Sequence, residues 1–155
     1  MKPSAVFKDR QMKIVIGCDH AAFQLKNILK TYLAEKGITV EDAGTHGMES
    51  VNYPDYAKKV ASAVARGEFD RGILLCGTGL GMSITANRFK GIRAALCNDV
   101  FLAKMSRQHN DSNILVLGAR VIGDVLALEI LRTWIETPFE GGRHLDRIKM
   151  MDSLD

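Results

Sequence analysis

Cys76 and Thr78 are the residues with the strongest chemical character, because they stand among three glycines at alternate positions, Gly77, Gly79 and Gly81. The apolar run 72–75 before them is typical of a strand buried on both faces of a parallel sheet. Residues 82–87 after them predict a helix. A glycine loop between strand and helix points backbone N–H groups and the positive end of a helix dipole toward an anion. The stretch therefore predicts a site for a small phosphorylated or oxyanion-forming substrate.

The glycine spacing excludes two common nucleotide sites. Gly-x-Gly-x-Gly differs from the Gly-x-Gly-x-x-Gly dinucleotide fingerprint, and no Lys-Ser/Thr pair follows to make a nucleoside-triphosphate loop. A second interpretation is a tight strand-to-helix turn with a buried, inert cysteine. The stretch by itself leaves both interpretations open.

Asp19 and His20 follow another predicted strand, 13–17. The carboxyl end of a parallel strand is where open α/β sheets place their chemistry. In the alternative, Asp19 caps the next helix and His20 is an exposed residue of its first turn. Capping still leaves a carboxylate able to bind a sugar hydroxyl. Tyr53 precedes the proline that opens another predicted helix. Its ring is either a hydrophobic staple for that helix or a wall of the site, and the staple is slightly favoured.

Three further groups carry polar chemistry. His109 and Asn110 offer a proton carrier and an amide between a helix and the strand 114–117, although a solvated helix end is the commoner meaning of such a run. Arg120 leaves that strand at the same sheet edge as the glycine loop. Arg143 and Arg147 are four residues apart on one helix face and together suit a phosphate, or an ordinary salt-bridged surface.

Five predicted strands alternate with helices, at 13–17, 38–40, 72–75, 93–96 and 114–117. This alternation predicts an α/β fold, a three-layer αβα sandwich around a five-stranded parallel sheet. The carboxyl edge of that sheet collects Asp19, His20, Cys76, Thr78, the glycine loop and Arg120. His109, Asn110 and the arginine pair lie in other loops, and periodicity does not decide whether they reach the same site across a subunit interface.

The 155 residues predict one domain, at 12–155, preceded by an appendage, 1–11, that is disordered or foreign to the natural chain. A net charge of +3, spread along the chain, argues against nucleic acid and membrane partners. Three widely spaced cysteines favour neither a disulfide framework nor a zinc site, and they fit a reducing, cytoplasmic location. No apolar run reaches transmembrane length.

Five motifs in order carry a resemblance that covers nearly the whole chain from Met12. They are Gly-Cys-Asp-His at 17–20, Asn-Tyr-Pro-Asp-Tyr-Ala at 52–57, Cys-Gly-Thr-Gly-Leu-Gly at 76–81, Ser-Arg-Gln-His-Asn-Asp at 106–111 and Glu-Gly-Gly-Arg-His at 140–144. Together they resemble the ribose-5-phosphate isomerase type B enzymes of the ribose/galactose isomerase family. The resemblance implies a Rossmann-like fold, no metal or cofactor, and dimers or tetramers whose active sites use both subunits.

The implied reaction interconverts D-ribose 5-phosphate and D-ribulose 5-phosphate through a cis-enediol(ate). Some members use the cysteine that is here Cys76 as the base, and others a glutamate that would fall at Met82, so this chain resembles the cysteine subtype. By the same resemblance His109, helped by Thr78 or Asp19, opens the sugar ring. The implied phosphate ligands are Arg120, Arg143 and Arg147, and the implied sugar contacts are His20, Tyr53 and Asn110.

Two alternatives stay open at this stage. The substrate could be a six-carbon sugar phosphate, such as allose or galactose 6-phosphate, because a motif does not encode pocket length. A non-catalytic sugar-phosphate binding module would keep the N–H cradle of Gly77, Gly79 and Gly81 without turnover. Exchange of solvent protons into the substrate separates an enzyme from a binding module.

Overall fold

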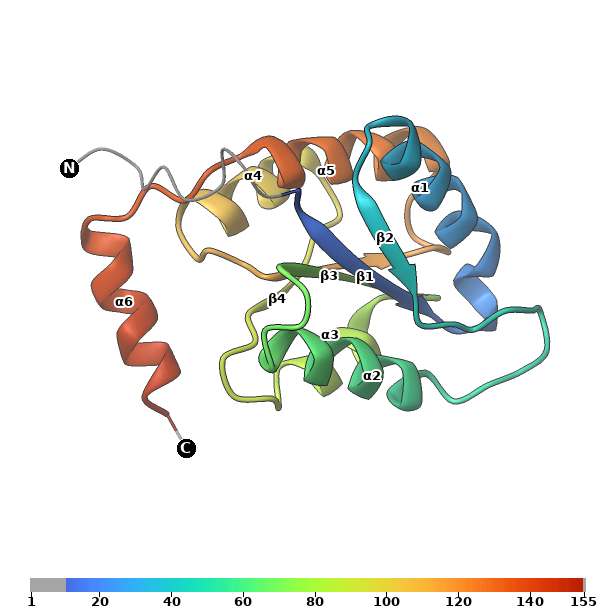
Figure 1. Cartoon of the computed structure of the whole chain (residues 1–155), viewed down its shortest axis with the longest axis horizontal. Helices are drawn as coiled ribbons and strands as arrows, with labels where there is room; N and C mark the ends of the chain where they lie inside the picture. Colours follow the sequence, from blue (N-terminus) through green and yellow to red (C-terminus); the bar gives the residue numbers. More distant parts are fainter. Residues whose placement is uncertain (1–10, 155) are drawn as a thin grey trace.

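A computed structural model describes residues 11–154, and its centre is a sheet of five parallel strands (Figure 1). The strands lie in the order β2-β1-β3-β5-β4 and are β1 (Lys13–Cys18), β2 (Thr39–Asp42), β3 (Arg71–Cys76), β4 (Ala94–Leu96) and β5 (Ile114–Gly118). The helices are α1 (Phe23–Glu35), α2 (Tyr53–Ala65), α3 (Leu80–Ala86), α4 (Val100–Gln108), α5 (Asp124–Glu136) and α6 (Arg143–Asp152). The predicted parallel α/β fold is confirmed.

The central strands are covered on both faces. Every residue of β5 is buried, and in β3 the first residue alone, Arg71, is partly exposed. Ile73 packs into the core on one face of the sheet, and Leu74 packs into the core on the other. Because successive strand residues point to opposite faces and both faces are covered, the sequence of β3 is continuously apolar rather than alternating.

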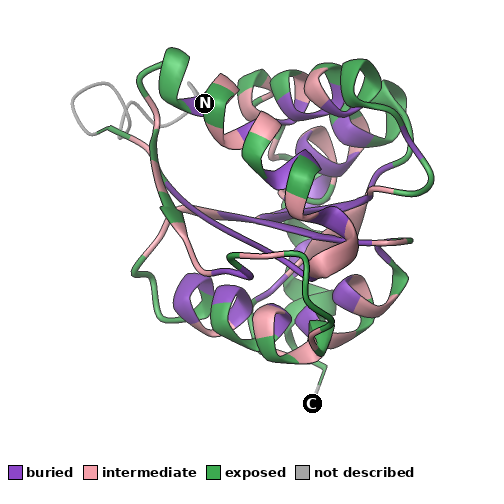
Figure 2. Ribbon diagram, turned by 90° about the vertical axis from the view of Figure 1, so that its right-hand side faces the viewer, coloured by how far each residue is buried: buried purple, intermediate pink, exposed green. Residues whose placement is uncertain are grey.

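Two helical layers enclose the sheet (Figures 1 and 2). Helices α1, α4 and α5 cover one face, where the core includes Leu29 and the fully buried Trp134. Helices α2 and α3 cover the other face, where Val60 and Met82 are fully buried. In Figure 2 the strands are mostly purple, for buried, between helices whose outer faces are green, for exposed. The predicted three-layer sandwich is confirmed.

The strand order places a switch point between β1 and β3. β2 lies on one side of β1, whereas β3 and the later strands lie on the other. Loops that leave β1 and β3 therefore diverge, and the crevice outside such carboxyl ends is where open parallel sheets bind ligands. The N–H of Asp19 donates to the carbonyl of Leu75 over 3.2 Å, so the first residue after β1 lies beside the end of β3.

Two helices begin at different residues from those predicted. α3 begins at Leu80 rather than at Met82, because the N–H of Leu80 donates to Oγ1 of Thr78 over 3.2 Å. α5 begins at Asp124 rather than near Ile122, directly after Gly123. In both places a residue of the preceding turn determines where the helix begins, and hydrophobic periodicity gives no information on such a residue.

The last helix, α6, lies outside the sandwich, at the end of the sheet where the strands begin (Figure 1). Its buried residues are His144 and Ile148, and its far end is tied to the body by Arg93, which donates to the Asp152 carboxylate over 3.0 Å. Most of the helix surface, including Met150, is exposed.

The predicted appendage, 1–11, lies outside the described residues except for Gln11. The side-chain amide of Gln11 donates to the backbone carbonyl of Gly37. Within residues 11–154 every helix is too short or too polar to span a bilayer.

Candidate active site

Cys76 is the last residue of β3, and its sulfur lies under the glycine loop. Sγ accepts the N–H of Gly79 over 3.2 Å. Gly79 has a φ of 80°, in the left-handed region that glycine adopts without strain, and a Cβ there would lie 2.5 Å from Leu96 Cδ1. The loop thus holds the thiol against a backbone donor, an arrangement that stabilises negative charge on sulfur.

Further donors belong to the same loop. Among the described residues, the backbone N–H groups of Gly77 and Thr78 have no hydrogen-bond partner. The N–H of Arg120 donates to the Gly77 carbonyl over 2.9 Å, and the Arg120 side chain lies 3.4 Å from where a Cβ on Gly77 would stand. Two open N–H groups therefore lie in the loop directly after the thiol, with a guanidinium against it, which suits an oxyanion.

Tyr53 forms a wall beside the same loop. A Cβ on Gly81 would lie 2.4 Å from its ring, and Tyr53 is itself 39% exposed. Tyr53 is the first residue of α2, after the N-cap residue Asn52, rather than the residue before the helix cap. The staple interpretation, which the sequence slightly favoured, is therefore wrong, and the ring lies against the loop instead.

Asp19 and His20 complete the carboxyl edge. The carboxylate of Asp19 accepts the N–H of Ala21 over 3.0 Å and caps the short 3₁₀ turn His20–Ala22, so the predicted capping role is confirmed. Nδ1 of His20 accepts the N–H of Val51 over 3.2 Å. This bond assigns the proton of the neutral ring to Nε2, which is left as a donor. His20 also anchors the loop that leads into Tyr53.

A buried ion pair supports this edge, and the sequence reasoning missed it. Lys26 is fully buried; its Nζ donates to Asp42 Oδ1 over 2.7 Å and to the Thr45 carbonyl. The N–H of Thr45 in turn donates to the carbonyl of Cys18 over 2.8 Å. Lys26 therefore joins the carboxyl ends of β1 and β2. A lysine within an amphipathic helix gives no signal of this role, because lysines usually lie at the surface.

The other two cysteines have different surroundings from Cys76. Burial raises the pKa of Cys18 to about 11, although Lys26 acts in the opposite direction. Burial likewise raises the pKa of Cys97 to about 11, against a hydrogen bond with Ser106. Thiols of this kind are protonated near neutral pH and serve as core residues.

The remaining predicted residues lie at the opposite edge of the sheet. His109 follows α4, which runs back from the end of β4 to the start of β5. Arg143 and Arg147 lie exposed in α6, at the same end of the molecule. The two edges are roughly 16 Å apart, because a parallel strand rises about 3.3 Å per residue. Within one chain the structure therefore does not bring His109, Asn110 or this arginine pair to Cys76.

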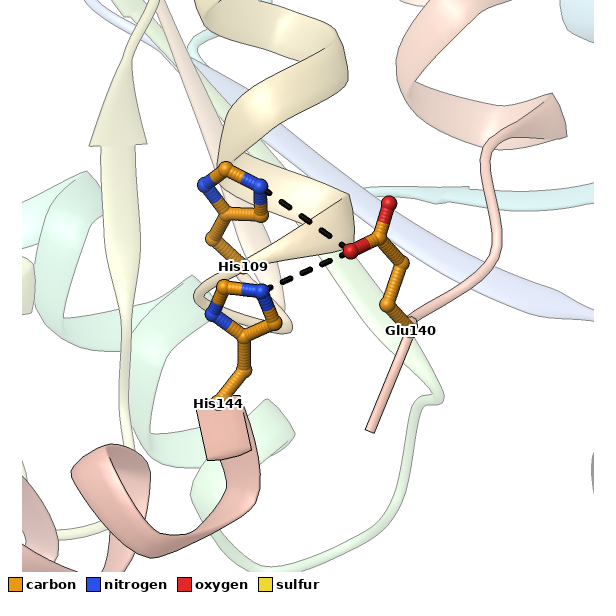
Figure 3. Close-up of side chains that lie close together, drawn as sticks. All are labelled: His109, Glu140 and His144. Atoms are coloured by element: carbon orange, nitrogen blue, oxygen red, sulfur yellow. Dashed lines mark ion pairs between the residues drawn. The ribbon is translucent and has the colours of Figure 1, made fainter. Parts of the chain in front are cut away.

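His109 belongs to a cluster with Glu140 and His144, and the sequence reasoning gave the last two no role. The two imidazole rings are stacked, with centroids 4.2 Å apart and planes 11° apart (Figure 3). Glu140 Oε2 lies 3.4 Å from His144 Nε2 and 4.0 Å from His109 Nε2. The four-residue spacing of Glu140 and His144 was the signal available in the sequence.

Three donor atoms of this cluster lie within 4.8 Å of one another, as in a metal site. The stacked rings argue against a metal ion bound by these three residues. Zinc lies about 2.0 Å from a histidine nitrogen, along a lone pair in the ring plane. Because the two planes are nearly parallel, their lone pairs do not converge, and an ion in the plane of one ring lies out of the plane of the other.

A cavity of about 800 Å³ lies at this same end, between the 87–95 segment and the end of α6. Asn110 contributes to its wall, together with Arg93 and Asp152. The cavity therefore adjoins the loop that carries His109 and lies away from Cys76.

The fold and the carboxyl edge define a class: a parallel α/β protein with a thiol and a backbone anion cradle at its switch point. Residues 14–151 match the ribose/galactose isomerase family. Ribose-5-phosphate isomerase B of Escherichia coli is 49% identical over 143 residues, which are 92% of this chain and 96% of that protein. The D-erythrulose-4-phosphate isomerase of Pectobacterium atrosepticum is 46% identical over 139 residues, 89% of this chain and 91% of that protein.

Solved structures agree. A crystal structure of a ribose 5-phosphate isomerase from Thermotoga maritima matches with a TM-score of 0.91 and 57% identity, covering 94% of this chain and 100% of that one. The chain belongs to the ribose/galactose isomerase family, as its five motifs predicted.

We expect Asp42→Asn to destabilise the fold strongly, because it leaves the buried Lys26 ammonium without its counter-charge. Removing one partner of such a pair costs about 3–5 kcal/mol in the free energy of unfolding. Chemical denaturation at pH 7 measures the loss. Glu68→Gln, which breaks the exposed Arg66–Glu68 pair, is the matched control and should change little.

The loss should also depend on pH. Burial raises the pKa of Asp42, but hydrogen bonds from Lys26 and Lys30 outweigh burial and lower it overall. The stabilisation is therefore present above the unfolded-state pKa of about 3.9 and disappears as the pH falls through the lower folded value. The difference between Asp42→Asn and the parent protein should shrink below about pH 4. A difference that stays constant down to acid unfolding contradicts this role.

Proposed function

We propose that this protein is an aldose–ketose isomerase that interconverts D-ribose 5-phosphate and D-ribulose 5-phosphate. The observation that carries the proposal is the Cys76 sulfur, which accepts the Gly79 N–H and lies beside the open N–H groups of Gly77 and Thr78. A base next to oxyanion donors is what proton transfer beside a carbonyl requires. Relatives named for this reaction align over almost the whole chain.

The first step moves a proton between oxygens, because ribose 5-phosphate is mostly a closed furanose. The hydroxyl on C1 loses a proton, the ring oxygen gains one, and the bond between C1 and the ring oxygen breaks. We assign this step to His109, because histidine is the side chain that most often carries protons in general acid–base catalysis. Thr78 or Asp19 assists from the carboxyl edge.

The second step moves a proton between carbons. The Cys76 thiolate removes the proton from C2 of the open aldehyde and returns it to C1 through a cis-enediol(ate), while O1 gains a proton and the hydroxyl on C2 loses one. Charge on the enediolate oxygens is held by N–H groups of the loop from Gly77 to Gly81, in which those of Gly77 and Thr78 are open. Met82, at the position of the glutamate base of other members, is fully buried and has no carboxylate, which supports the cysteine subtype.

Three arginines are assigned to the phosphate. Arg143 and Arg147 are exposed and four residues apart in α6, a spacing that lets both guanidinium groups face one anion. Arg120, beside Gly77, is the third. We assign the sugar hydroxyls to His20, Tyr53 and Asn110, whose ring nitrogen, phenol and amide supply hydrogen bonds.

A homo-oligomer follows from the two sets of residues. Cys76 and His109 lie at opposite edges of one sheet, so they act on one substrate only if they come from different chains. Large apolar side chains are exposed where α3, α4 and α5 begin, at the edge that carries Cys76, and they include Leu80, Ile84, Phe101, Val121 and Val125. Such a surface next to an incomplete site suits a second copy of the chain, as a dimer or tetramer.

Residues 12–155 form the single isomerase domain of this proposal, since the family match spans 14–151. We place the protein in the cytoplasm. Its free cysteines, Cys18, Cys76 and Cys97, suit a reducing compartment, and relatives act on sugar phosphates, which are metabolites.

We expect Cys76→Ala to lose about 10²- to 10⁴-fold in kcat while it still binds substrate, because a positioned base is removed and the cradle is kept. Cys97→Ala, which alters a buried thiol in the core on the other face of the sheet, is the matched control. The assay follows ribose 5-phosphate, with erythrulose 4-phosphate, allose 6-phosphate and galactose 6-phosphate in parallel. Full activity of Cys76→Ala rules out this base. Turnover of another sugar alone keeps the mechanism and replaces the substrate.

Mixed oligomers test the shared site. Cys76→Ala and His109→Ala are each inactive, but a dimer with one chain of each has one intact site. Random mixing should therefore restore about one quarter of the parent activity, because half of the dimers are mixed and each has one of two sites. His109→Ala mixed with Arg147→Ala is the control: both residues come from the same side of the interface, so every site keeps one defect. Equal recovery in both mixtures contradicts the shared site.

A further inference from the structure

The proposed reaction uses His109 but gives no task to Glu140 and His144, which lie against it. The three side chains come from different segments: the end of α4, the loop before α6 and the first turn of α6. The loop is fixed to α4 by the Glu140 N–H, which donates to the Gln108 carbonyl over 3.1 Å. His144 is 8% exposed and His109 is 41% exposed, so the inner ring supports the outer one.

The charges around His144 disfavour its protonated form. Burial lowers the pKa of His144, His109 and Arg143 lower it further, and Arg147 acts in the same direction; Glu140 alone raises it. Two positive rings stacked at 4.2 Å would also repel each other. The surroundings therefore disfavour the protonated form of His144, the inner ring of the stack.

The direction of the rings decides which ring nitrogen carries the proton of a neutral imidazole. Both Nε2 atoms face the Glu140 carboxylate, and both Nδ1 atoms point to the other side (Figure 3). Neither contact, at 3.4 Å for His144 and 4.0 Å for His109, is a hydrogen bond, but the negative charge of the carboxylate attracts an N–H dipole and repels a lone pair, so it favours the tautomer that carries the proton on Nε2. The Nδ1 of His109 is then left with its lone pair.

We propose that Glu140 is a positioning residue, which with His144 holds His109 in the tautomer whose Nδ1 takes the proton from the C1 hydroxyl and returns it to the ring oxygen. The inference rests on the proposed function, because it needs His109 as the group that opens the ring. The imidazole gains one proton from the C1 hydroxyl and gives one to the ring oxygen, so it ends the step unchanged. Glu140 keeps its charge throughout.

The test separates the two proton transfers. Ribulose 5-phosphate is open-chain, because its C5 oxygen is esterified and cannot close a furanose on C2. Exchange of deuterium from heavy water into its C1 position thus needs Cys76 but no ring opening. Conversion of ribose 5-phosphate needs both steps. Glu140→Ala should lower the conversion about 10- to 100-fold, which is less than the roughly 10²- to 10⁴-fold cost of losing an acid–base group itself, and leave the exchange rate within about twofold.

Two variants accompany Glu140→Ala. Glu140→Gln keeps an acceptor oxygen and should recover part of the conversion. Glu35→Ala, at the exposed end of α1, should leave both rates unchanged. Nitrogen NMR of the labelled histidines reads the tautomer directly: Nδ1 of His109 should be unprotonated in the parent protein and a mixture of tautomers in Glu140→Ala.

Each other outcome overturns the inference. Equal losses in conversion and exchange make Glu140 a structural residue, and no loss in either gives it no role. Conversion that is lost on chelation and restored by zinc makes the cluster a metal site instead. If the parent protein shows no exchange at all, the proposed function itself fails, which this pattern distinguishes from failure of the Glu140 role.

Discussion

The common direction of the five strands governs the chemistry of this molecule. A parallel sheet gathers strand ends and helix starts at one edge, and strand starts and helix ends at the other. Cys76 and its glycine loop lie at the first edge, while His109 and α6 lie at the second, roughly 16 Å away. A thiol and an imidazole so separated cannot meet one small sugar within a chain. Each monomer thus supplies one half of one proposed site at its first edge and one half of another proposed site at its second edge.

At the carboxyl edge, the packing leaves no room for a Cβ at two glycine positions, so backbone groups come close together there. A Cβ on Gly118 would lie 2.5 Å from the Thr78 carbonyl oxygen, and one on Gly81 would meet the Tyr53 ring. The backbone can therefore turn tightly around the sulfur and direct the Gly79 N–H at it. The Lys26–Asp42 pair below keeps the ends of β1 and β2 at a fixed distance. Rigidity here has a clear use, because oxyanion donors act only when they are oriented in advance.

The two proposed proton transfers have different requirements, and the two edges meet them separately. Removing a proton from carbon needs a strong, sheltered base, and Cys76 is buried beneath a donor. Moving a proton between two oxygens needs a group that gains and loses it easily, which describes an imidazole. His109 is half exposed and supported by a second ring and a carboxylate.

Much of the architecture follows from the sequence alone. The apolar run 72–75 predicted a strand covered on both faces, and the alternation of strands and helices predicted the parallel sheet. The same pattern placed Asp19, Cys76, Thr78 and Arg120 at one edge, because each follows a strand of known direction. The five motifs predicted the family.

Tertiary structure alone decided the rest. The ring of Tyr53 lies on Gly81, the buried Lys26 charge lies against Asp42, and Glu140 faces two stacked imidazoles. Each of these contacts joins side chains from separate elements, or sets the angle between a loop and a helix. Sequence periodicity records which face of one element is apolar, but it holds no information on distances between elements. Those distances are fixed only when the whole core packs, and that is why the positions of the strand ends were predictable and the partners of Lys26 and His109 were not.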